Sequence, residues 1–232
     1  PPPPPPPSLP PPSPPPPSLP PPFPPIAFSV TSTVGVPAGV AASLTAADLA
    51  ADVESAALAG SSRESVAVTI VKTDRVDVPL PTGVTANEMK LALDEEICGD
   101  APSFVCSVDV VTSRLRQRML TAGAFTVTQN LNASSNVSLA APTVDPTGLA
   151  NQLNNITNVT VSASDVPATA TVQSVAAEVT VTETGNAANG ADAAVVAELN
   201  AMPTLLAAAL NVNATQVAVL VAPVTIAPPM PP

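Results

Sequence analysis

The chain has 232 residues, of which 32 are proline and none is histidine, tryptophan or tyrosine. Without imidazole it lacks the usual general base near neutral pH and the commonest transition-metal ligand, which excludes Ser-His-Asp, Cys-His and Cys/His zinc sites. Its net charge of -11 argues against nucleic acid and anionic membranes as partners, because both are bound through Lys and Arg. We therefore expect no enzyme, no cofactor, no metal site and no nucleic-acid partner.

Residues 1–25 are almost entirely proline, and their first residue is Pro1 rather than methionine, so we expect a processed product or a segment of a longer chain. Each proline fixes φ and removes a backbone donor, which leaves polyproline II as the conformation for a spacer of roughly 75 to 80 Å. Serines recur every five residues, at Ser8, Ser13 and Ser18, so successive hydroxyls point in different directions around the rod. Either the rod is decorated on all sides or the serines only punctuate a low-complexity linker.

The run Ser13-Pro14-Pro15-Pro16-Pro17 resembles the Ser-Pro repeats of extensins and of hydroxyproline-rich glycoproteins on plant and green-algal surfaces. The resemblance implies hydroxylation and arabinosylation of Pro14, Pro15, Pro16 and Pro17, and galactose on Ser8, Ser13 and Ser18. It also implies a place in a composite shaft such as that of flagellar mastigonemes. The prolines in 223–232 predict that a second proline-rich tract starts there.

Four helix starts share one local pattern. Thr45 with Asp48, and Thr85 with Glu88, each fit a capping box, in which hydroxyl and carboxylate satisfy backbone donors of the first turn. A third start places Asp145 as N-cap before Pro146. We expect Asp192 to cap the fourth.

Between these helices the hydrophobic period changes to two, which predicts short strands. The fold class we expect is α+β, with the polyproline II rod followed by two small ferredoxin-like (β-α-β-β-α-β) sandwich domains at 26–131 and 136–222, joined by a linker at 132–135. In the first domain we expect a strand at 26–34, a helix at 45–59, a hairpin at 66–80, a helix at 85–98 and strands at 104–112 and 123–130. In the second we expect a strand at 136–141, a helix at 146–154, strands at 158–164 and 172–182, a helix at 193–210 that is kinked at Pro203, and a strand at 216–222.

The ferredoxin-like order is shared with SEA domains, and residues 113–128 resemble an Arg- and Leu-rich hairpin found in ectodomain modules of algal surface proteins. Self-cleaving SEA domains use a Gly-Ser pair in a strained hairpin, and no such pair stands at the corresponding place. Gly60 and Ser61 follow a helix and fit its C-terminal cap instead. We therefore expect a SEA-like module without autoproteolysis.

Cys98 and Cys106 are the only two cysteines. They end a helix and begin a strand, and a connection of this length lets their side chains meet. We expect a disulfide, hence an oxidising compartment, with two buried thiols as the alternative.

Five Asn-x-Ser/Thr sequons predict N-glycosylation, at Asn132, Asn136, Asn155, Asn158 and Asn213. Two of them lie at the expected linker. Asn155 and Asn158 are so close that we do not expect both to carry a glycan.

Three other clusters have simpler interpretations. Asp94, Glu95 and Glu96 occupy consecutive helix positions, so their carboxylates point apart and form a solvated face. The arginines at 114, 116 and 118 fit a solvated strand edge. The loop 184–192 is rich in Asn, Gly and Asp, but lacks EF-hand spacing and fits a plain turn better than a Ca²⁺ site.

Together these features favour a non-catalytic structural component of an extracellular glycoprotein assembly, such as a cell wall, matrix or mastigoneme. Its partners would be other structural glycoproteins or copies of itself, with covalent glycans. No membrane insertion is expected, because prolines and polar residues interrupt the uncharged stretch after Glu198. The alternative is an adhesion ectodomain or a proline-rich ligand for SH3, WW or profilin-type partners.

Overall fold

The computed structural model describes residues 26–58, 65–99, 101, 105–111, 122–185 and 191–226, so the expected rod at 1–25 lies outside the described residues. The fold is α+β, as expected, with a single six-stranded antiparallel sheet over these ranges. Its strands are β1 (Ile26–Val36), β2 (Ser65–Pro79), β3 (Cys106–Val110), β4 (Ala122–Asn132), β5 (Thr169–Gly185) and β6 (Ala218–Ile226). The helices are α1 (Ala38–Ala41), α2 (Ala46–Ala57), α3 (Ala86–Ile97), α4 (Pro146–Ile156) and α5 (Ala191–Ala209).

Local capping fixes where three helices start, and the sequence predicts all three. Thr45 before α2 and Thr85 before α3 each form a complete capping box, in which the hydroxyl accepts from the N3 amide and the N3 carboxylate accepts from the threonine amide. Asp145 caps α4 by accepting from the amides of Thr147 and Gly148. The expected cap at Asp192 is wrong, because α5 begins at Ala191 and Asp192 is already its second residue.

The hairpin expected at 66–80 is instead the single 15-residue strand β2. The stretch holds no Gly, Asn or internal Pro that would turn the chain, and every even position from Val68 to Val78 is buried. Lys72, Thr73 and Asp74, in the middle of the expected hairpin, continue the strand.

Two further strands expected from the sequence are absent from the described residues. Only one bridge, from Ser138 to Thr45, forms within 136–141, and the region 158–164 contains the start of a 3-10 helix, Ala163–Asp165. Conversely, β6 reaches Ile226, so the first residues of the tract expected at 223–232 belong to a strand.

The sheet unites both halves of the chain in the order β3-β4-β2-β5-β1-β6. Because β5 lies between β1 and β2, the boundary expected at 132–135 does not separate two sheets. The elements β1-α2-β2-β5-α5-β6 form one β-α-β-β-α-β unit, and β2-α3-β3-β4-α4-β5 form a second one inserted within it. The long strands β2 and β5 belong to both units.

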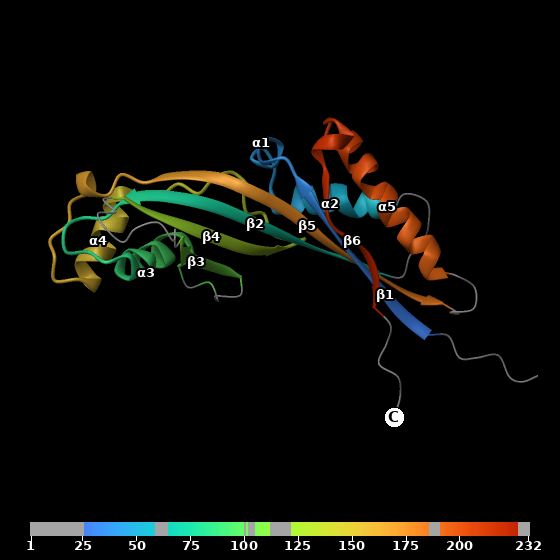
Figure 1. Ribbon diagram of the computed structural model, residues 1–232, viewed down its shortest axis with the longest axis horizontal. Coiled ribbons are helices and arrows are strands. Elements are labelled where there is room, and N and C mark those ends of the chain that lie inside the picture. Colours follow the sequence, from blue (N-terminus) through green and yellow to red (C-terminus); the bar gives the residue numbers. More distant parts are fainter. Residues whose placement is uncertain are drawn as a thin grey trace, which may run out of the picture.

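Each unit has its own hydrophobic core. The terminal core lies between α2, α5 and the strands β1, β2 and β5, and its largest buried members are Leu49, Ile70, Leu139, Leu199, Met202 and Leu206. The central core lies between α3, α4 and the strands β2, β3 and β4, and its largest are Met89, Leu93, Phe125, Leu149 and Leu153. Figure 1 shows the two helix pairs at opposite ends of one long twisted sheet.

Both helix pairs cover the same face of the sheet. On β2 the buried side chains are those at even positions, Val68 and Ile70 in the terminal core and Val76 and Val78 in the central core. Side chains of alternate residues point to opposite faces, so odd positions face away from the helices. That open face carries many threonines, and Thr31 lies 3.1 Å from Thr180 across neighbouring strands, hydroxyl to hydroxyl.

The capping boxes predict an acid-sensitive fold. Hydrogen bonds from Thr45 hold the pKa of Asp48 below its ordinary 3.8, and those from Thr85 hold the pKa of Glu88 below 4.5. Because folding lowers both pKa values, the stabilisation is complete above about pH 4.5 and is lost as pH falls through the folded values. The variant Asp48→Asn/Glu88→Gln keeps the acceptors but not the charges. We expect its Tm to lie below that of the wild type at pH 6 and to converge with it by about pH 2 in thermal scans. A constant gap would contradict this assignment.

Candidate functional site

A buried ion pair lies where the two cores meet. Lys72 and Asp74 occupy the even positions of β2 between the terminal and central cores, and their side chains are 2% and 0% exposed. Lys72 Nζ lies 2.6 Å from Asp74 Oδ2. In the cross-strand register Lys72 stands between Gln129 and Val175, and Asp74 between Val127 and Val172.

This pair is poorly compensated by other polar groups. Among the described residues, no hydrogen bond of ordinary geometry reaches either carboxylate oxygen of Asp74, so contact with the ammonium group is what offsets its burial. Burial raises the pKa of the Asp74 carboxyl above its ordinary value, while Lys72 opposes that rise. Because folding raises this pKa, Asp74 is held more easily in its protonated form, and the stability that this form contributes at low pH is lost as pH rises through the folded pKa. The capping carboxylates have the opposite pH dependence.

The same strand carries a solvated counterpart on its open face. Arg75 and Asp77 have the same spacing of two residues, and Arg75 Nη2 lies 2.9 Å from Asp77 Oδ1 with side chains 42% and 48% exposed. The two pairs therefore differ in burial far more than in local geometry.

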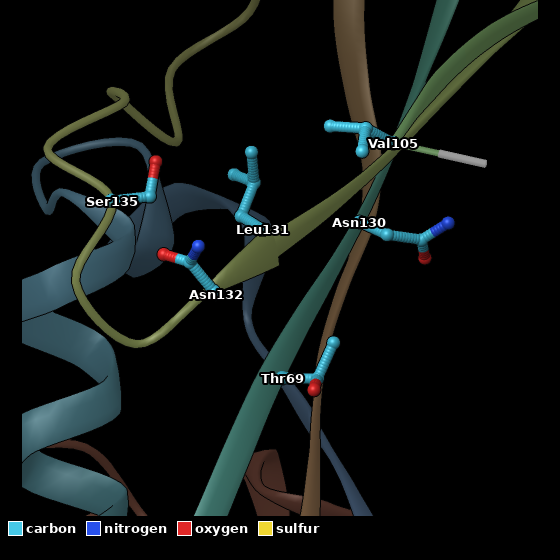
Figure 2. Close-up of a pocket in the computed structure, with 6 residues that line it drawn as sticks. All are labelled: Thr69, Val105, Asn130, Leu131, Asn132 and Ser135. Carbon is cyan, nitrogen blue, oxygen red and sulfur yellow. The ribbon is translucent and has the colours of Figure 1, made fainter. Parts of the chain in front are cut away.

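A shallow pocket of about 310 Å³ opens at the end of β4. Figure 2 shows its lining, which comes from β2, the residue before β3, the last residues of β4 and the segment that follows: Thr69, Val105, Asn130, Leu131, Asn132 and Ser135. None of these six side chains is charged, so the pocket offers hydrogen bonds and apolar contact but no acid-base group. Sequence analysis singled out only Asn132 of this set.

The disulfide expected from the sequence is present. Cys98 ends α3 and Cys106 begins β3, with their Cα atoms 5.6 Å apart. Gly99 adopts a φ of 54°, and its amide donates to the carbonyls of Asp94 and Glu95, which ends the helix. The bridge ties α3 to the central core, in which Cys106 is buried.

All five sequon asparagines have exposed side chains: Asn132, Asn136, Asn155, Asn158 and Asn213. At two of them the hydroxyl two residues later already donates to the asparagine side chain: Ser134 Oγ lies 2.9 Å from Asn132 Oδ1, and Thr215 Oγ1 lies 3.0 Å from Asn213 Oδ1. Asn155 instead lies within α4, and the Thr157 hydroxyl donates to the carbonyl of Leu153.

The other predicted positions contribute no assembled site. The arginine cluster at 114–118, the Gly60-Ser61 pair and the modified residues of 1–25 lie outside the described residues, as does most of the loop 184–192. In the ranges that are described, no three His, Cys, Asp or Glu side chains converge to hold a metal ion, and this includes Asp94, Glu95 and Glu96. Within the same ranges, no helix combines the length and the hydropathy needed to cross a bilayer.

Comparison with known proteins gives no relative for this chain, since no family model, curated protein or solved structure matches it.

The buried pair predicts an asymmetric mutational response. Lys72→Met leaves the Asp74 carboxylate buried without its partner, and we expect it to lower the free energy of unfolding by roughly 3–5 kcal/mol in urea titrations. Lys72→Met/Asp74→Leu removes both charges and should be neutral, or more stable by about 1–4 kcal/mol.

Arg75→Met is the matched control on the same strand, with an expected cost of at most about 1 kcal/mol because that pair is solvated. Equal losses for Lys72→Met and Arg75→Met would show that the Lys72–Asp74 pair is not buried in solution.

Proposed function

We propose that the chain is a non-catalytic structural component of an extracellular glycoprotein assembly, such as a cell wall, a matrix or a flagellar mastigoneme. The observation that carries the proposal is the exposure of every sequon asparagine on the folded part of the chain. Glycans attached at these positions would extend into solvent without displacing either core. The Cys98–Cys106 disulfide supports the same compartment, because such bridges persist in oxidising surroundings.

In this proposal the two parts of the chain have different tasks. Residues 1–25 form the stiff spacer, a polyproline II rod carrying hydroxyproline and sugar, as the likeness to extensins implies. The folded part provides lateral contacts, and its open sheet face, rich in threonine hydroxyls, supports close approach of a neighbour.

We further infer that the folded part consists of two interleaved ferredoxin-like units. Each unit has the order β-α-β-β-α-β, and in each the first strand lies between the last and the third. One unit is inserted into the β-β connection of the other. This arrangement supports a stiff module, because two shared strands run through both units.

The proposal predicts a modified protein in native material. Glycopeptide mass spectrometry should find hydroxyproline among Pro14–Pro17, glycans at Asn132, Asn136 and Asn213, and a glycan at one of Asn155 and Asn158. Enzymatic removal of N-glycans should lower the intact mass. Alkylation without reductant should leave Cys98 and Cys106 unlabelled.

Unmodified proline, bare asparagines and alkylated cysteines would overturn the proposal. That result would favour a proline-rich ligand of SH3, WW or profilin-type domains in a reducing compartment.

A further inference from the structure

The strand β6 forms an edge of the sheet that is unusually apolar. It pairs with β1 on one side, and no strand among the described residues pairs with its other side. Four of its side chains are about half exposed: Val219 at 50%, Leu220 at 56%, Val221 at 48% and Val224 at 55%. The remaining exposed large hydrophobic residues of the described chain are spread over separate segments, so β6 carries the one concentrated patch there.

The opposite edge of the sheet is protected. The strand β3 has only five residues. Its Asp109 side chain is 71% exposed, and Asp109 Oδ1 lies 3.3 Å from Lys90 Nζ. Short length, charge, proline and bulges are the usual means of preventing an edge strand from pairing with another chain, and β3 uses the first two. On β6 no residue is charged; its interruptions are Pro223 and two register shifts in the pairing with β1. The chain thus blocks one edge and leaves apolar surface on the other.

We propose that β6 is the contact through which two copies of this chain associate, antiparallel about a two-fold axis. The proposal rests on the proposed function, since it names the partner for the lateral contacts. Pairing centred on Ala222 places Leu220 of one copy opposite Val224 of the other, and Val219 opposite Thr225. Pro223 removes one backbone donor from the ladder, so burial of these side chains stabilises the contact more than hydrogen bonding does.

The distribution of charge favours a second copy over a charged partner and over a head-to-tail contact with β3. Neither β6 nor its neighbour β1 carries a charged residue, while the whole chain carries -11. A basic or acidic partner would find no counter-charge on this patch, whereas a second copy brings a matching neutral strand. A head-to-tail contact of β6 with β3 would place apolar side chains against the exposed Asp109.

Sedimentation velocity on the full chain, with its disulfide intact, tests the proposal over about 1 to 100 µM, a range that covers dimers of ordinary strength. The wild type should shift from monomer to dimer with concentration. Leu220→Lys should raise the dimer dissociation constant at least about tenfold, because it places a charge in the buried contact. Leu91→Lys on α3 is the matched control, since Leu91 is 55% exposed, and it should leave dimerisation unchanged. Circular dichroism verifies that both variants fold.

A wild type that stays monomeric at 100 µM, or a Leu220→Lys chain that dimerises like the wild type, overturns the proposal. Either result leaves the proposed function standing if native material carries hydroxyproline and N-glycans. Unmodified native protein would instead refute the proposed function, whatever its oligomeric state.

Discussion

Two strands, β2 and β5, have to belong to two hydrophobic cores at once, and the rest of the fold depends on this constraint. They span 15 and 17 residues and pair along nearly the whole length of β2. β2 contributes buried side chains to both cores, whereas β5 contributes buried side chains to the terminal core and the partly buried Ala170 to the central core. The two cores meet near the middle of β2, between Ile70 and Val76. The even positions there hold Lys72 and Asp74, which extend the strand through the junction as a buried ion pair.

Local chemistry made much of this fold predictable. Threonine-carboxylate capping boxes and the Asp145-Pro146 start fixed three helices, because these signals act within one turn. The interleaving was not predictable in the same way, since it depends on pairing between residues more than 100 positions apart, such as Val68 and Val179. The charged residues Lys72 and Asp74 in the middle of β2 also resemble the polar residues of a turn. The hydrophobic residues at even positions on both sides of the pair, Val68, Ile70, Val76 and Val78, were the signal that could have corrected it.

The candidate site was predictable where it rests on short spacing. The eight-residue separation of Cys98 and Cys106 and the tripeptide sequons needed no knowledge of the fold. The pocket beside Asn132 and the exposed edge β6 arise only when distant strands meet, so the sequence held no local sign of them. In the proposed assembly the disulfide and the shared strands stiffen the module, the glycans cover its polar surface, and β6 remains for contact between copies.

Hydrogen exchange in a core variant tests the sharing of β2 and β5 most directly. Leu206→Ala removes a fully buried side chain of the terminal core and should cost about 2–5 kcal/mol. If the two cores unfold as one unit, exchange measured by mass spectrometry should lose protection equally in α5 and in β4 of the central core. Unchanged protection of β4 alongside loss in α5 would contradict the account, because the two cores would then be independent despite their common strands.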